Sequence, residues 1–137
     1  MRTALDTNVL SALWSSEPEA SQIARRLERA YAEGGLVISA PVYAELLAHP
    51  SATVSFVDQF LANAGIVVDF DLTEEVWRLA AKGFASYAER RRSGKAESPK
   101  RLLVDFVIAA HALQAADCLM TLDKAPYSQD FPKLRIV

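Results

Sequence analysis

The sequence has few of the residues that build disulfide frameworks or zinc sites. Its single cysteine, Cys118, excludes an intrachain disulfide, and with only His49 and His111 beside it the chain lacks a convincing zinc ligand set. No apolar run reaches the roughly 18 residues that are needed to span a bilayer, and the first residues lead into strand-like sequence without a signal-peptide pattern. We therefore expect a cytoplasmic protein without a membrane anchor.

An excess of positive charge is also absent. The chain carries 15 Lys and Arg residues against 17 Asp and Glu residues, which gives a formal net charge of −2. This composition argues against a protein that coats nucleic acid through bulk charge, and it leaves room for a local basic patch. Any contact with a polynucleotide is therefore expected to be local.

The apolar content is sufficient for one core. With 137 residues, 51% of them hydrophobic, we expect a single domain over residues 1–137. Short apolar runs predict strands at 3–5, 36–39, 66–68 and 118–121, with a further edge strand at 134–137. Helical spacing of apolar residues predicts helices at 20–34, from 41 to beyond 45, at 54–64, from 72 or 74 to about 90, and from 102 or 103 to 115 or 116.

Strands that alternate with helices imply a mostly parallel sheet covered on both faces, because right-handed crossovers place the connecting helices there. The fold class that we expect is α/β, a three-layer α/β/α sandwich with a mostly parallel central sheet. Ligands of such folds bind outside the carboxyl ends of the strands.

Four acidic residues are spaced so that this fold would bring them to that edge. Asp6 directly follows the first expected strand, and Asp123 lies two residues beyond the expected strand that precedes it. Glu45 and Asp105 lie near the starts of expected helices, which share the same edge of the sheet. Taken singly, each has a structural explanation as a helix cap, a first-turn acid, an exposed helix residue or a turn former. Their joint placement favours a site.

Carboxylates in such a cluster repel by roughly 4 kcal/mol per close pair at an effective dielectric constant near 20. One or two divalent cations would remove this conflict. Oxygen ligands favour Mg²⁺ or Mn²⁺, and hydrolysis of a phosphodiester follows from the chemistry of such ions.

The segments around these acids form a set in a fixed order. They are Leu-Asp-Thr-Asn-Val-Leu at 5–10, Glu45 after Ala40-Pro41, Asp-Phe-Val-Ile-Ala-Ala-His-Ala at 105–112, and Thr-Leu-Asp at 121–123. Over essentially the whole chain this set resembles the PIN-domain family. The resemblance implies a metal-dependent ribonuclease, most like the VapC-type toxins, which cleave RNA, are silenced by a cognate antitoxin protein and usually work as homodimers. The RNA target does not follow from the motifs.

Carried over position by position, the resemblance makes Asp6, Glu45, Asp105 and Asp123 the catalytic and metal-binding acids for Mg²⁺ or Mn²⁺. Asn8 and Thr121 would orient ligands or waters, with local hydrogen bonding as the alternative for Asn8. The Thr7 hydroxyl has the simpler explanation of capping the following helix.

A basic segment lies between the two last expected helices. Its residues 89–101 carry six cations against two glutamates, so they hold a local charge of +4. These cations are Arg90, Arg91, Arg92, Lys95, Lys100 and Arg101. A solvated helix end is one interpretation, and contact with RNA phosphates is the other.

Two further functions compete with the nuclease. One is a catalytically silent PIN-fold module that binds RNA or protein. The other is a phosphatase or receiver-like protein with Asp6 as the phospho-acceptor, which the presence of Asn8 in place of a second aspartate disfavours.

Overall fold

The four β-strands form one parallel sheet with the order β3-β2-β1-β4. The computed structural model describes residues 1–94 and 100–137. The strands are β1 (Thr3–Leu5), β2 (Leu36–Ser39), β3 (Ile66–Asp69) and β4 (Cys118–Met120). β1 lies inside the sheet, because Thr3 is aligned with Leu36 of β2 on one side and with Cys118 of β4 on the other. The expected parallel sheet is confirmed.

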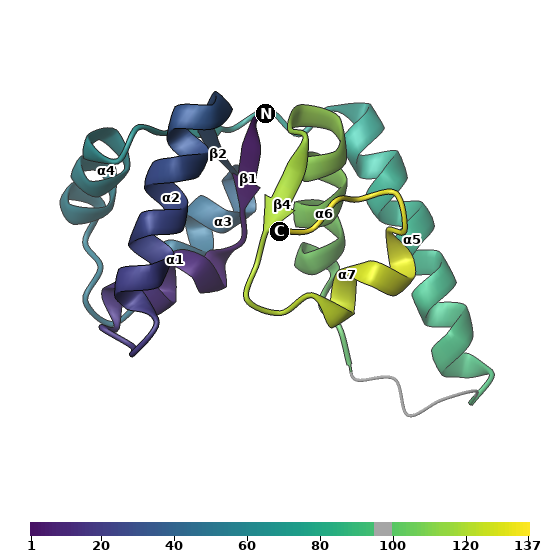
Figure 1. Ribbon diagram of the computed structural model, residues 1–137. Coiled ribbons are helices and arrows are strands. Elements are labelled where there is room, and N and C mark those ends of the chain that lie inside the picture. Colours follow the sequence, from purple (N-terminus) through teal and green to yellow (C-terminus); the bar gives the residue numbers. More distant parts are fainter. Residues whose placement is uncertain (95–99) are drawn as a thin grey trace.

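Helices cover both faces of this sheet, as expected for three layers (Figure 1). On one side lie α1 (Thr7–Trp14), α2 (Ala20–Gly34) and α4 (Val54–Asn63); on the other lie α5 (Glu74–Arg92), α6 (Leu103–Ala115) and α7 (Ala125–Asp130). The short α3 (Ala40–Leu46) follows β2 directly and contacts both α1 and α6. Across residues 1–94 and 100–137, none of the helices is both long and apolar enough to span a bilayer.

Side-chain caps and glycines fix the ends of several helices. Thr53 and Thr73 cap α4 and α5 by accepting hydrogen bonds from the amides of Phe56 and Val76. Asp71 and Thr73 both precede α5 in the sequence and both are residue types that cap helices, and the structure uses the threonine. At the end of α2, Gly35 has a φ of 98°, which lies in the region that favours glycine.

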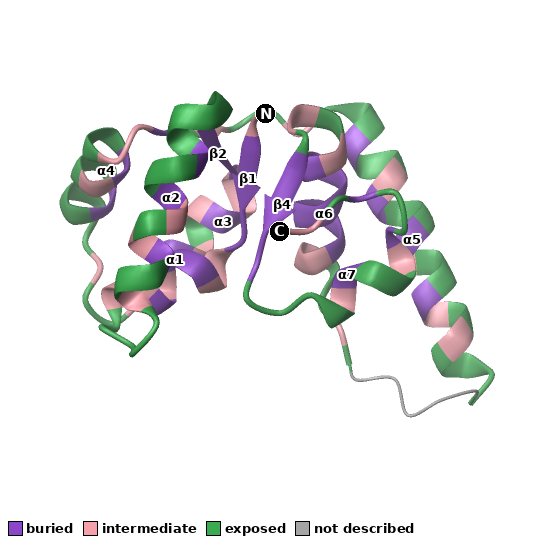
Figure 2. Ribbon diagram, in the orientation of Figure 1, coloured by how far each residue is buried: buried purple, intermediate pink, exposed green. Residues whose placement is uncertain are grey.

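The core is concentrated around β1, β2, β4 and α6, which Figure 2 shows as the most buried elements. The spacing of Asp105, Ile108, Ala109 and Ala112 predicts one buried stripe on α6, but every residue from Phe106 to Ala112 is buried. The reason is that α5 covers the side of α6 that faces away from the sheet. Three alanines in this stretch are almost completely buried, and their small side chains permit close packing.

The C-terminal segment differs from the expectation. The apolar pattern predicts no helix at residues 125–130, but these residues form α7, and Pro126 occupies its first turn, where a missing amide hydrogen has no cost. The expected edge strand at 134–137 is reduced to a single parallel bridge between Ile136 and Leu119 of β4. The tail therefore lies along β4 without extending the sheet by a full strand.

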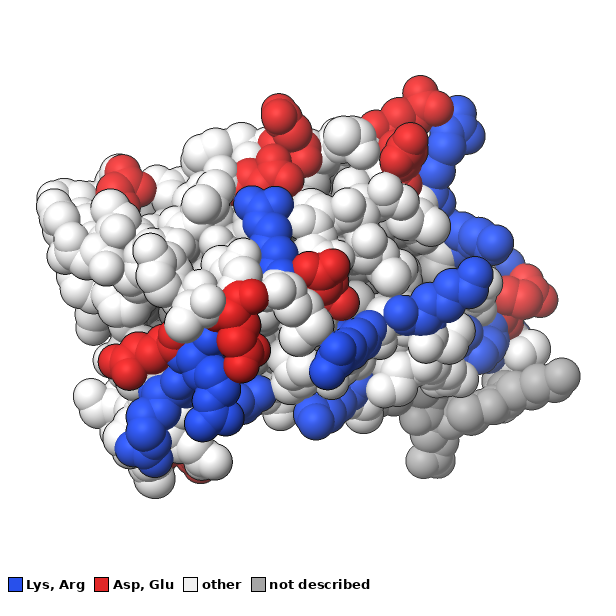
Figure 3. All heavy atoms as spheres, turned by 45° about the horizontal axis from the view of Figure 1, so that its top comes forward, with Lys and Arg blue, Asp and Glu red and all other residues white. Residues whose placement is uncertain are grey.

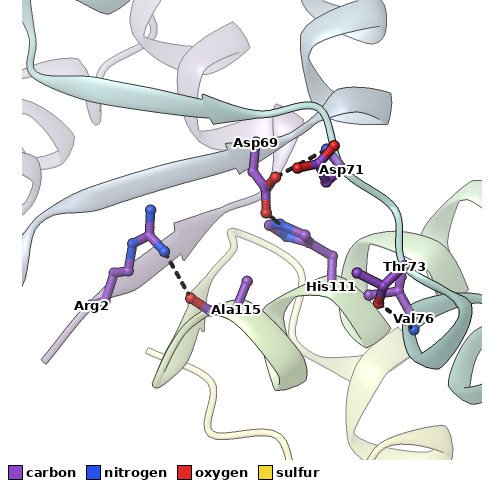
Figure 4. Close-up of polar contacts among 7 residues, drawn as sticks. All are labelled: Arg2, Asp69, Asp71, Thr73, Val76, His111 and Ala115. Atoms are coloured by element: carbon purple, nitrogen blue, oxygen red, sulfur yellow. Dashed lines mark hydrogen bonds and ion pairs between the residues drawn. The ribbon is translucent and has the colours of Figure 1, made fainter.

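A buried histidine links α6 to the end of β3 (Figure 4). His111 is only 1% exposed, and its Nε2 lies 2.9 Å from Oδ2 of Asp69. The amide of Asp71 donates to the other carboxylate oxygen at 3.0 Å. Partial burial acts to raise the pKa of Asp69, but the hydrogen bonds from His111 and Asp71 outweigh it and lower the pKa. The carboxylate of Asp69 is thus the partner of an imidazole that has little access to water.

We expect Asp69→Ala to destabilise the protein by about 1–3 kcal/mol, because it leaves the buried His111 ring without this partner. Urea denaturation measures the loss. The lowered pKa also gives the sign of the pH dependence: this stabilisation is present above the unfolded pKa and is lost as the pH falls through the folded pKa. Asp71→Ala is the control, since only its backbone amide contacts Asp69. An equal loss in the two variants would contradict the assignment.

Candidate functional site

A cleft at the carboxyl ends of β1 and β4 is lined by all four acidic residues that the sequence brought together. Its volume is about 370 Å³, which is room for several water molecules. Asp6 comes directly after β1, Glu45 lies on α3, Asp105 lies in the first turn of α6, and Asp123 follows β4. The first turns of α1, α6 and α7 lie toward this side of the sheet, the lower side in Figure 1.

Asp6 is the most enclosed of these acids, with 7% of its surface exposed. Its Oδ1 accepts a hydrogen bond from the amide of Thr7 at 2.8 Å, so the side chain caps α1. Its Oδ2 accepts two hydroxyl hydrogen bonds, from Thr121 at 2.9 Å and from Tyr127 at 2.7 Å. These three donors fix the carboxylate plane.

Asn8 and Thr121 join α1 to the loop after β4. The Asn8 amide nitrogen donates to the Thr121 hydroxyl oxygen at 3.2 Å, and the Asn8 amide oxygen accepts from the Leu122 backbone at 3.1 Å. The backbone amide of Asp123 donates to the same Thr121 oxygen at 3.2 Å. Through these contacts Thr121 connects Asp6 with the backbone of Asp123.

The electrostatics of the cleft show excess negative charge. Burial is the main cause that raises the pKa of Glu45, and the charges of Asp6 and Asp105 add to it, while a 2.6 Å hydrogen bond from the Thr7 hydroxyl opposes it. Burial likewise raises the pKa of Asp105, together with the charges of Asp6 and Asp123. Two of the four carboxyls thus sense their acidic neighbours.

The donor set of the cleft suits a hard divalent cation, because carboxylate oxygens are the ligands that Mg²⁺ and Mn²⁺ prefer. In residues 1–94 and 100–137, no three His, Cys, Asp or Glu side chains stand in an arrangement that already forms an ion site. The four acids share one cleft, and two of them have pKa values raised by the others. The carboxylate ligands and the excess negative charge of the cleft therefore fit a divalent cation. Binding of such a cation would require the acidic side chains to adjust around it.

Without divalent cations, we expect Glu45→Gln to be more stable than the wild type at pH 7, because it removes one charge from the cluster. The sign follows from the raised pKa: the stability that protonated Glu45 contributes is complete below the unfolded pKa and is lost as the pH rises through the folded pKa. The advantage of the variant should therefore shrink as the pH falls. Thermal unfolding in chelator between pH 7 and pH 4 measures it. Glu75→Gln, an exposed acid on α5, should show no such trend.

The structure separates the six cations of the basic segment. Arg101 lines the acidic cleft. Arg90 pairs with Asp130 at 2.5 Å, and Arg91 donates to the Tyr87 hydroxyl at 3.1 Å. The remaining three are Arg92, which forms an exposed pair with Glu89, Lys100, which is exposed, and Lys95, which lies outside the described residues. Of the five cations that the structure describes, Arg101 alone lines the cleft.

Two further residues of the cleft with polar side chains, Tyr127 and Ser11, have no sequence signal that marks them as site residues. Tyr127 lies on α7, which the apolar pattern does not predict, and Ser11 lies one turn along α1. Thr7 had only the role of a cap, yet its hydroxyl donates to Glu45 and Asp6 does the capping. A helical interpretation of residues 125–130, with Pro126 in the first turn, would have placed Tyr127 near the start of a helix at the same edge.

The fold and this cleft define an α/β protein with an acidic site at the carboxyl edge of a parallel sheet. The model of the PIN domain family matches residues 3–132. The chain belongs to the PIN domain family.

Solved structures give the same fold. The chain is similar to VapBC-1 from nontypeable Haemophilus influenzae, with 24% identity, a TM-score of 0.67, and coverage of 100% of this chain and 97% of that one. It is also similar to VapBC2 from Rickettsia felis bound to a promoter DNA fragment, with 22% identity, a TM-score of 0.66, and coverage of 100% and 98%. FitAcB from Neisseria gonorrhoeae has 22% identity, a TM-score of 0.65, and coverage of 98% and 95%. No curated protein matches the chain.

Proposed function

We propose that this protein is a metal-dependent endoribonuclease that hydrolyses RNA phosphodiester bonds, and that it is a VapC-type toxin of a toxin–antitoxin pair. PIN domains are generally nucleases, which supports the reaction class. The observation that carries the proposal is the convergence of Asp6, Glu45, Asp105 and Asp123 on one cleft.

In this proposal the four acids hold Mg²⁺ or Mn²⁺. Such an ion, when bound, supplies a nucleophilic water at neutral pH and neutralises the charge of the phosphate. Three hydrogen bonds fix the carboxylate of Asp6 in the orientation in which it would bind the ion. Thr121 contacts both Asp6 and the amide of Asp123, so it fixes one acid relative to the backbone of the other. Asn8, which lies on α1, donates a hydrogen bond to the Thr121 hydroxyl oxygen and so helps to hold it in place.

The ribonuclease is tested by incubating metal-stripped protein with total cellular RNA, with and without Mg²⁺ or Mn²⁺, and sequencing the ends of the products. Discrete cuts that need the ion would establish the activity and name the target. No cleavage by folded protein in the presence of the ions would instead favour the alternative, a catalytically silent PIN-fold module that binds RNA or protein.

Arg101 is the cation that the proposal assigns to an RNA phosphate beside the cut, because it lines the acidic cleft. We expect Arg101→Gln to weaken binding of single-stranded RNA and to reduce the slope of log K against log salt by about 0.7. Fluorescence anisotropy in chelator, across a salt series, measures both changes. Arg78→Gln, which removes an exposed cation of α5, is the control. An unchanged slope for Arg101→Gln would remove this residue from the RNA interface.

RNA binding in this proposal does not depend on a large basic surface. The face shown in Figure 3 is turned toward the upper side of Figure 1, away from the cleft, and carries groups of Lys and Arg side chains with Asp and Glu side chains among them. The net charge of −2 favours contacts with RNA that are confined to the cleft and the residues beside it.

The proposed partners are a cognate antitoxin and a second copy of the chain. The similar solved structures include VapBC-1, VapBC2 and a toxin–antitoxin complex from Klebsiella pneumoniae, which supports an antitoxin. Exposed apolar side chains, including Phe70 at 64% and Val67 at 54%, offer surface for protein contacts. Co-expression with a small DNA-binding protein from the adjacent reading frame tests the antitoxin through copurification. Light scattering of the purified chain tests the homodimer.

A further inference from the structure

The hydroxyl of Tyr127 reaches the acidic cleft from α7, an element that no motif of the sequence indicated. Tyr127 is 4% exposed, and its hydroxyl donates to Oδ2 of Asp6 at 2.7 Å. The Thr121 hydroxyl donates to the same oxygen at 2.9 Å. Two donors from different segments of the chain therefore converge on one carboxylate oxygen.

The two carboxylate oxygens of Asp6 differ in the number of hydrogen bonds that they accept. A carboxylate oxygen has two acceptor positions, and Oδ2 uses both for Thr121 and Tyr127. Oδ1 accepts one hydrogen bond, from the amide of Thr7. It keeps one acceptor position, so Oδ1 is the oxygen of Asp6 with capacity for a cation.

Contacts outside α7 hold Tyr127 in place, because a helix of six residues has little stability of its own. Arg90 on α5 pairs with Asp130 on α7 at 2.5 Å, and the Asp130 side chain is only 4% exposed. Phe131, directly after α7, is 6% exposed, and its ring lies beside that of Phe106 of α6 at a centroid distance of 6.0 Å and a tilt of 52°. α5 and α6 thus anchor the C-terminal end of α7.

We propose that α7 is a positioning element for the ion site, in which Tyr127 and Thr121 hold Oδ2 of Asp6 so that Oδ1 faces the cation. The Arg90–Asp130 pair holds α7 and through it Tyr127. This inference rests on the proposed function, because it assigns the cleft to a divalent cation. It also gives Arg90 a role inside the protein, in place of the RNA contact that the sequence suggested.

The test is the affinity for Mn²⁺ of metal-stripped Tyr127→Phe, measured by titration calorimetry at a temperature where the variant is folded. We expect the dissociation constant to rise about tenfold or more, as is typical when a residue that orients a metal ligand is lost. Tyr43→Phe is the matched control: it also removes a hydroxyl that donates to a carboxylate, that of Asp58, on an exposed part of the surface. Its Mn²⁺ affinity should equal that of the wild type.

A second variant tests the anchoring of α7. Arg90→Gln should weaken Mn²⁺ binding in the same direction, and the effects of Arg90→Gln and Tyr127→Phe should not add in the double variant, because both act through one contact. Arg78→Gln removes an exposed arginine of the same helix and should leave the affinity unchanged.

The outcomes separate the inference from the proposed function. If the wild type binds Mn²⁺ and Tyr127→Phe binds it equally well, α7 has no positioning role and the proposed nuclease is unaffected. If the wild type binds no Mn²⁺, both fail together. A lower melting temperature of Tyr127→Phe with unchanged Mn²⁺ affinity would mean that the hydroxyl serves stability alone, which also overturns the inference.

Discussion

Asp6→Asn is expected to reduce the rate of RNA cleavage by about three orders of magnitude while the protein remains folded. The variant removes one negative charge from the cleft that would hold the cation, and an amide is a weaker ligand than a carboxylate. A loss of about 4 kcal/mol in the stabilisation of transition-state charge corresponds to this factor. Cleavage of a fluorescent RNA that contains the mapped cut site, with excess Mg²⁺ or Mn²⁺, measures the rate.

The matched control for this prediction is Asp71→Asn, which changes an exposed aspartate in the loop before α5. It should cleave RNA at the wild-type rate. Circular dichroism of Asp6→Asn guards against loss of the fold, since Asp6 also caps α1 and accepts from Tyr127. A folded Asp6→Asn protein with near wild-type activity would contradict the assignment of the cleft as the catalytic site.

Leu10→Ala is expected to destabilise the protein by about 3–4 kcal/mol, the largest loss of stability that we predict. Leu10 lies on α1 and its side chain is completely buried, so truncation removes its apolar contacts and leaves a cavity that the core fills only partly. Such a loss is a large share of the stability of a typical domain, about 5–15 kcal/mol. Urea denaturation followed by tryptophan fluorescence measures it.

Leu102→Ala provides the comparison for Leu10→Ala. This leucine precedes α6 and is 62% exposed, so the same change of side chain should cost less than about 1 kcal/mol. Similar losses at both positions would show that the core around α1 is more loosely packed than the burial of Leu10 indicates.

The elements of the fold were largely predictable because their signals are local. Thr3–Leu5, Leu36–Ser39 and Cys118–Met120 are short apolar runs in the sequence, and Gly35 ends α2 where the apolar pattern ends. The segment after β4 was not predictable in the same way, because two prolines suggested a connection. One of these, Pro126, instead occupies the first turn of α7, and the helix is held by a contact with α5 that lies 40 residues away in the sequence.

Some residues of the candidate site were likewise predictable from the sequence, and others were not. Its four acids follow from the order of strands and helices, since the ends of parallel strands and the starts of the next helices share an edge. The hydroxyl of Tyr127 and the approach of Arg101 depend on how α7 and the start of α6 pack, which no local pattern encodes. For the same reason the sequence could not distinguish Arg90 from Arg101. Both are cations of one basic segment, but Arg90 pairs with Asp130 and Arg101 lines the cleft.

The pairing of β1 with β4 sets the moment in synthesis at which the cleft can exist. Thr3 to Leu5 lie beside Cys118 to Met120, so the central strand of the sheet obtains its second neighbour only after more than a hundred further residues have been made. Both hydroxyl donors to Oδ2 of Asp6 come from residues beyond β4. A nascent chain therefore lacks the assembled cleft until Thr121 and Tyr127 have left the ribosome, so the order of translation delays the formation of the candidate site.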